Sequence, residues 1–98
     1  MAAYFLAVMD VTDPDGFQQY AAAAMPSFEG VNFEILAIAD DPEPLEGKLP
    51  ASHFAIIKFE DEEAAHAWYN SPSYAKAKPI RLNATTNGFA AILPGFSM

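Results

Sequence analysis

The stretch Tyr4-Phe5-Leu6-Ala7-Val8-Met9-Asp10-Val11 decides the fold of this chain. It is a nearly continuous apolar run rich in strand formers, which is typical of a β-strand covered on both faces. Successive side chains of a strand point to opposite faces. The apolar residues therefore form two sets, Phe5, Ala7, Met9 and Val11 on one face and Tyr4, Leu6 and Val8 on the other. Both faces of the sheet that contains this strand need a covering layer.

A helix is expected directly after this strand. Asp13 is a suitable N-cap, Pro14 fits the first helical position, and Asp15 suits the positive start of the helix. Apolar side chains then recur at helical spacing and define one buried face, at Phe17, Tyr20, Ala21, Ala24 and Phe28. Pro26 is expected to end or distort this helix.

The remaining elements follow from similar patterns. Strands are expected at residues 31–38, 53–59 and 89–93, and helices at residues 60–70 and 71–79. One face of the second strand is predicted to hold Val31, Phe33, Ile35 and Ala37. Residues 40–50 contain three prolines and four acidic residues and are expected to form a long loop. Pro79 lies close to the point where the last helix is expected to stop or kink.

The order of these elements predicts the architecture. Strand, helix, strand, strand, helix, strand in one short chain indicates a single α+β domain over residues 1–98, with a ferredoxin-like βαββαβ topology. Its four-stranded antiparallel sheet would carry both helices on one face. The other face would expose more apolar surface than a monomer tolerates. We therefore expect a homodimer in which two sheets pack face to face around a two-fold axis.

Composition excludes several classes of function. A net charge of −8 argues against binding to nucleic acid or to anionic membrane surfaces. No apolar run is long enough for a membrane span, and no signal peptide is recognisable, so we expect a cytoplasmic protein. The absence of cysteine removes disulfides and thiolate chemistry. No metal-ligand spacing and no nucleotide-binding motif is present, and we expect neither a metal nor a cofactor.

A small basic island contrasts with this acidic composition. Residues 64–98 contain Lys76, Lys78 and Arg81 and no acidic residue. The island would either attract an anionic ligand or form the ordinary C-terminal end of a helix, where the helix dipole favours cations.

Several short segments of the sequence together form a recognisable set of motifs. They are Val11-Thr12-Asp13-Pro14, Tyr20-Ala21-Ala22-Ala23, Leu45-Glu46-Gly47, Ala67-Trp68-Tyr69-Asn70-Ser71-Pro72-Ser73-Tyr74 and Arg81-Leu82. Together they resemble the domain of unknown function 1330 family, within the dimeric α+β barrel superfamily. The resemblance covers nearly the whole chain. It implies a ferredoxin-like fold and a sheet-to-sheet dimer, and it implies no particular reaction.

Aromatic residues and one cation form the main candidate for a binding site. The predicted ligand-binding residues are Tyr20, Glu46, Trp68, Tyr69 and Tyr74, beside Arg81. Arg81 is suited to binding a carboxylate in bidentate fashion or to stacking on a ring. Such a cleft would suit a small aromatic or enol-like acid. The alternative is that Tyr20, Trp68 and Tyr74 pack in the core, and that Arg81 pairs with Glu46 or with a C-terminal carbonyl.

His53 and Arg81 are the predicted catalytic residues. His53 opens the third expected strand beside the long loop and is the candidate general base. Arg81 would stabilise an enolate. His66 is predicted to lie on the solvent side of its helix.

Two functions stay open at this point. The first is a dimeric protein that binds a small organic molecule, with or without cofactor-free proton transfer. The second is a non-catalytic dimeric interaction module whose cleft is filled by Trp68 and Tyr74.

Overall fold

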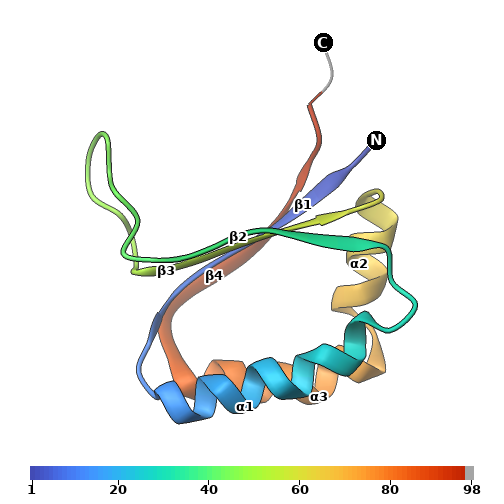
Figure 1. Cartoon of the computed structure of the whole chain (residues 1–98), viewed down its shortest axis with the longest axis horizontal. Helices are drawn as coiled ribbons and strands as arrows, with labels where there is room; N and C mark the ends of the chain where they lie inside the picture. The colour runs from blue at the N-terminus through green and yellow to red at the C-terminus, as the bar shows by residue number, and fades with distance from the viewer. Residues whose placement is uncertain (97–98) are drawn as a thin grey trace.

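The computed structural model describes residues 1–96 of the chain. Its elements, in chain order, are β1 (Ala3–Val11), α1 (Pro14–Ala24), the 3₁₀ helix η1 (Met25–Phe28), β2 (Phe33–Asp40), β3 (His53–Phe59), α2 (Glu62–Tyr69), α3 (Pro72–Ala84) and β4 (Thr85–Pro94). The elements appear in this order along the colour gradient of Figure 1.

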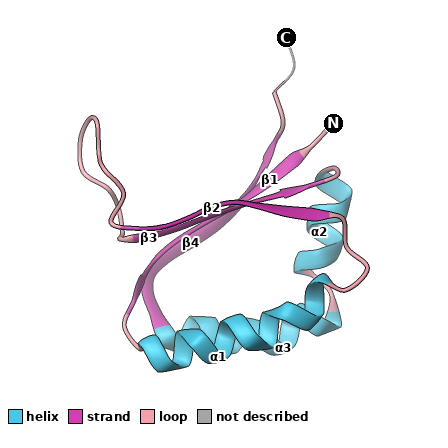
Figure 2. Cartoon of the chain, in the orientation of Figure 1, coloured by secondary structure: helices cyan, strands magenta, loops and turns pink. Residues whose placement is uncertain are grey.

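The four strands form one antiparallel sheet in the order β2-β3-β1-β4. All helices lie on one side of this sheet, as Figure 2 shows. The predicted ferredoxin-like α+β fold with helices on one face is therefore confirmed. β1 is central, with β3 and β4 on its two sides, which explains why its sequence is apolar on both faces.

Local capping explains where the helices begin. The Asp13 carboxylate accepts a hydrogen bond from the Gly16 N–H at the start of α1. Asp61 accepts from the Ala64 N–H at the start of α2. The Ser71 hydroxyl oxygen does the same for α3. Each side chain satisfies a backbone donor that has no partner inside its helix.

The expected end of the last helix near Pro79 is wrong. α3 continues to Ala84 with Pro79 inside it, although an interior proline removes one helical hydrogen bond. Tertiary contacts stabilise the extra turn. The backbone N–H groups of Thr12 and Asp13 donate to the Ala84 carbonyl at 2.9 and 3.1 Å, and the Thr85 hydroxyl donates to the Arg81 carbonyl at 2.8 Å. Arg81 is consequently a helical residue.

The edge strands also differ from expectation. β2 covers Phe33–Asp40 and β4 begins at Thr85, whereas the sequence indicated residues 31–38 and 89–93. The register of β2 against β3 shifts between Ile35 and Ala37. Ala37 is paired with Ile56 and therefore faces away from the helices, and not on the side of Phe33 and Ile35 as predicted.

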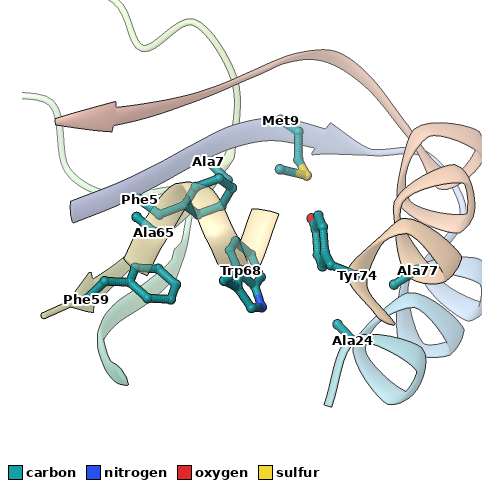
Figure 3. Close-up of a cluster of buried hydrophobic side chains, with 9 residues drawn as sticks. All are labelled: Phe5, Ala7, Met9, Ala24, Phe59, Ala65, Trp68, Tyr74 and Ala77. Atoms are coloured by element: carbon teal, nitrogen blue, oxygen red, sulfur yellow. The ribbon is translucent and has the colours of Figure 1, made fainter. Parts of the chain in front are cut away.

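The core lies between the sheet and the helices. Its buried members are Phe5, Ala7, Met9, Ala24, Phe59, Ala65, Trp68, Tyr74 and Ala77, which Figure 3 shows gathered between β1 and the helical layer. Trp68 is central, since its ring is stacked against Phe28 and lies close to the rings of Phe5 and Tyr74.

The opposite side of the sheet, called here the outer face, is mostly apolar, with the paired residues Glu34 and Lys58 as charged members. It carries Tyr4, Leu6 and Val8 from β1, Phe54 and Ile56 from β3, Ala37 and Ala39 from β2, and Phe89, Ala91 and Leu93 from β4. Within residues 1–96 no helix covers this face (Figure 2).

Candidate functional site

A cleft of about 350 Å³ lies between α3 and β4. We call it the α3–β4 cleft. Its lining residues are Met9, Tyr69, Lys78, Arg81, Leu82, Thr85, Thr86, Asn87, Gly88, Phe89 and Ala90. The additional turn of α3 builds one wall, and the first half of β4 builds the other. Gly88 allows β4 to approach β1 closely here, because a Cβ at this position would lie 3.0 Å from the Cβ of Met9.

Arg81 is the most unusual residue of the α3–β4 cleft. Its side chain is buried, with 6 % of the residue exposed, and its Nε has no hydrogen-bond partner within residues 1–96. Nor does any carboxylate in that part of the chain form an ion pair with it. A buried guanidinium normally has an anionic or hydrogen-bonding partner, since removing the charge from water is costly. The alternative in which Arg81 pairs with Glu46 is not found within residues 1–96.

The lining of the cleft is positively charged. Lys78 and Arg81 contribute two positive charges, and no acidic residue is among the lining residues of the described chain. The whole protein has a net charge of −8. A local cationic site in an acidic protein favours a small anion that reaches the cleft over a large polyanion such as nucleic acid.

Tyr69 lies beside these two cations. The Nζ of Lys78 is 4.5 Å from the centroid of the Tyr69 ring. The ammonium of Lys78 acting on the hydroxyl has the largest effect on the pKa of Tyr69 and lowers it. Burial has the second-largest effect and opposes this shift, while the charges of Lys78 and Arg81 lower the pKa further. The cleft thus favours the phenolate form of Tyr69 relative to an ordinary tyrosine.

Tyr74 has the opposite environment. It is fully buried, and its hydroxyl lies 2.9 Å from the Tyr20 hydroxyl, which α1 contributes. Burial is the main cause that raises the pKa of Tyr74, and Tyr20 raises it further, while the charge of Arg81 opposes the shift. In Figure 3 the Tyr74 hydroxyl points from α3 toward Met9 of β1. Tyr20 and Tyr74 thus form a hydrogen-bonded pair between α1 and α3.

Trp68 is a core residue. Its indole Nε1 donates a 2.9 Å hydrogen bond to the Ser27 hydroxyl oxygen, and 3 % of the residue is exposed. Trp68 and Tyr74 are thus both buried core residues, and their ligand-binding roles stay predictions. Among the predicted binding residues, Tyr69 and Arg81 line the α3–β4 cleft.

His53 and Glu46 lie elsewhere. His53 is buried at the start of β3, which β1 separates from β4. Its Nδ1 is 2.8 Å from Oδ1 of Asp40. Glu46 belongs to the loop between β2 and β3, which extends away from the helices in Figure 1. The structure does not bring these two residues to the α3–β4 cleft, and their functional roles stay predictions.

Residues that the sequence analysis did not select also build the site. Asn87 adopts a left-handed backbone with φ of 55°. Its side-chain amide donates to the Pro50 carbonyl at 2.6 Å and to the Asp10 carboxylate at 3.4 Å. Asp10 also accepts from the Ser52 N–H at 2.9 Å. The cleft wall is thereby tied to the end of the long loop. The dipeptide Asn87-Gly88, typical of turns, was the available sequence signal.

Two other features are absent from residues 1–96. No group of three or more His, Asp or Glu side chains there is arranged to hold a metal ion. No helix of that region combines the length and the apolar character that crossing a membrane requires.

Solved structures with a similar fold come from several organisms. A protein of unknown function from Rhodopseudomonas palustris is 16% identical, with a TM-score of 0.77 over 99% of this chain and 84% of that one. A dimeric ferredoxin-like protein of unknown function from Thermobifida fusca is 16% identical, with a TM-score of 0.64 over 97% and 92%. SnoaB, a cofactor-independent oxygenase from Streptomyces nogalater, is 14% identical, with a TM-score of 0.67 over 99% and 95%. At these identities the likeness concerns the fold.

Sequence comparison gives the family. Among curated proteins none matches this chain. The profile of the family described as Domain of unknown function (DUF1330) matches residues 2–96. Because the match extends over nearly the whole chain, the protein belongs to the DUF1330 family.

Proposed function

We propose that this protein is a homodimer that binds a small organic anion in the α3–β4 cleft, with Arg81 as the anchor of the ligand. The observation that carries the proposal is the buried guanidinium of Arg81, which lacks a carboxylate partner within residues 1–96. An arriving carboxylate would supply the missing partner, and Arg–carboxylate pairs are among the strong hydrogen-bonded contacts of proteins.

The size and lining of the cleft favour an organic anion. Its volume of about 350 Å³ is at the lower end of the range for small-molecule sites. Met9, Leu82 and Ala90 offer apolar surface beside the two cations. A carboxylate attached to a small apolar or aromatic body would use both parts of this lining.

The dimer is proposed from the outer face. Phe89 and Leu93 of β4 on this face are 47 % and 43 % exposed. A second copy of the sheet would cover these side chains, and a self-complementary patch of this kind favours a two-fold dimer. The ferredoxin-like neighbour from Thermobifida fusca is dimeric, which supports a dimer here.

Proton transfer without a cofactor is a compatible activity. The structural neighbour SnoaB is a cofactor-independent oxygenase, so this fold accommodates cofactor-free chemistry. Cationic groups such as Arg81 and Lys78 stabilise developing oxyanions. The alternative function, a non-catalytic interaction module, would leave the cleft without a small ligand.

Binding of benzoate and phenylpyruvate to the native protein and to Arg81→Met tests the proposal, with isothermal titration calorimetry as the measurement. We expect the substitution to weaken binding by about 10- to 100-fold, the worth of hydrogen bonds to a charged group. Lys76→Met is the matched control, because it removes the same charge from an exposed position of the same helix. Equal affinity of the native and Arg81→Met proteins would contradict the role of Arg81. Failure of the native protein to bind either acid would favour the interaction module.

A further inference from the structure

We infer that Tyr69 is the acid–base residue of the α3–β4 cleft, and that the substrate class is the enolisable 2-oxo carboxylic acids. This inference rests on the proposed binding function and adds to it a reactive group and a substrate chemistry.

The position of Tyr69 carries the first part of the inference. Its side chain is half-buried and lines the α3–β4 cleft together with Lys78 and Arg81. It also lines an adjoining groove of about 410 Å³ between α2 and β4, beside Phe5, His66 and Ile92. Tyr69 therefore forms the boundary between the cleft and a second opening. A proton at its hydroxyl can be exchanged with solvent and with a ligand in the cleft.

The neighbouring charges suit an acid–base phenol. Lys78 and Arg81 of α3 both favour the phenolate of Tyr69. From α2, His66 and Glu62 line the adjoining groove, and Tyr74 of α3 lies with its ring centroid 5.5 Å from that of Tyr69. Tyr74 remains protonated through burial and its bond to Tyr20. The pKa values of Tyr69 of α2 and Tyr74 of α3 are thus shifted in opposite directions, and Tyr69 is the phenol suited to proton exchange.

The pair of cations carries the second part of the inference. A simple carboxylate needs one cationic partner, whereas the cleft offers Arg81 and Lys78. An enolisable 2-oxo acid has a carboxylate in its resting form and develops a second negative oxygen when it loses a proton from carbon 3. Arg81 would bind the carboxylate, and Lys78 would face the developing enolate oxygen.

The reaction needs no further reactant. The Tyr69 phenolate accepts the proton from carbon 3, so that the C–H bond breaks and the O–H bond forms. The released electron pair forms the carbon–carbon double bond, and the 2-oxo oxygen becomes the enolate oxygen, which takes a proton from water when the enol is released. In the reverse direction the Tyr69 hydroxyl protonates carbon 3, and its phenolate is available for the next cycle.

Phenylpyruvate is the probe for the test. Its keto–enol interconversion is followed by absorbance, and deuterium incorporation at carbon 3 is followed by NMR in heavy water. We expect the native protein to accelerate both the interconversion and the deuterium incorporation. In Tyr69→Phe both rates should fall by about 100-fold or more. The dissociation constant of Tyr69→Phe for phenylpyruvate should stay near the native value. Tyr4→Phe is the control, since it removes a phenol from the outer face.

The outcomes separate the two proposals. Binding without acceleration, or an unchanged rate in Tyr69→Phe, would overturn the role of Tyr69 and leave anion binding intact. A rate lost in His53→Ala but retained in Tyr69→Phe would transfer the proton-transfer role to His53 and also overturn the inference. Absence of phenylpyruvate binding to the native protein, with benzoate still bound through Arg81, would overturn the substrate class alone. Absence of binding by both acids would overturn the proposed function as well.

Discussion

The indole Nε1 of Trp68 donates a 2.9 Å hydrogen bond to the hydroxyl oxygen of Ser27, and this bond joins α2 to the 3₁₀ helix η1. Both residues are buried, so water cannot replace either partner. The Ser27 hydroxyl in turn donates to the Ala24 carbonyl. The one tryptophan of the chain is thereby fixed as part of the core.

Removal of this acceptor should destabilise the fold. In Ser27→Ala the Trp68 N–H would be buried without a partner, which typically costs about 1–3 kcal/mol of unfolding free energy. Urea denaturation followed by Trp68 fluorescence measures the change. Ser73→Ala is the control at a half-buried serine of α3 with no side-chain hydrogen bond in the described chain. Equal stability of the native and Ser27→Ala proteins would contradict the importance of this bond.

Tyr20 and Tyr74 provide a second stability prediction. Their hydroxyls lie 2.9 Å apart and connect α1 to α3. A double-mutant cycle of Tyr20→Phe and Tyr74→Phe, measured by chemical denaturation, should give a coupling energy of about 0.5–1.5 kcal/mol. Additive effects of the two substitutions would show that the hydroxyls do not stabilise one another.

Much of the fold was predictable because its signals are local. The N-caps Asp13 and Ser71 are adjacent in sequence to the helices that they begin, and the two-sided apolar pattern of β1 reflects its central position. The end of α3 was not predictable in the same way. It depends on the Thr12 N–H and the Ala84 carbonyl, which lie 72 positions apart in the chain. A proline at position 79 gives the opposite local signal.

The kinds of residue in the candidate site could be predicted from the sequence, but which of them line the cleft could be predicted only in part. Arg81 and Tyr69 were selected from the sequence, and both line the α3–β4 cleft. Trp68 and Tyr74 were selected with them, because an aromatic side chain that fills a core and one that lines a cleft follow the same helical spacing. Asn87 reaches the site through a left-handed backbone conformation at the register shift between β1 and β4, and through a contact with Pro50. Such long-range contacts have no pattern in the sequence.

The ionisation of Tyr69 should depend on Lys78. Because the Lys78 ammonium and the Arg81 charge lower the pKa of Tyr69, this tyrosine should ionise before an ordinary tyrosine as the pH rises. Tyr74, whose pKa burial raises, should ionise late. Lys78→Met should shift the Tyr69 titration to higher pH, and Lys76→Met should leave it unchanged. Tyrosinate absorbance measures the titration, with Tyr69→Phe to assign it. A titration that is the same in Lys78→Met and native protein would contradict this coupling.

Asp10 should contribute to stability in a pH-dependent way. Hydrogen bonds from Ser52, and then from Asn87, lower the pKa of Asp10 in the folded protein. Its contribution is therefore present above the pKa of the unfolded chain and is lost as the pH falls through the lower folded pKa. Asp10→Asn should reduce the loss of stability in acid, measured as the melting temperature across that pH range. Glu43→Gln, in the exposed loop, is the control. An acid dependence equal to that of the native protein would exclude this contribution.

The outer face gives the prediction that bears on assembly. Ile56 of β3 lies on this face between Leu6 of β1 and Ala37 of β2. In the proposed dimer, Ile56→Asp would bury a carboxylate without a partner at the sheet-to-sheet contact, which is strongly unfavourable. We expect native mass spectrometry to find a dimer for the native protein and a monomer for Ile56→Asp. Met25→Asp should remain dimeric, because Met25 is an exposed apolar residue on the helical side. A monomeric native protein would contradict the dimer. Arg81 lies on the helical side of the sheet, away from the outer face. Binding of benzoate by such a monomer would therefore show that the anion site is complete within one chain.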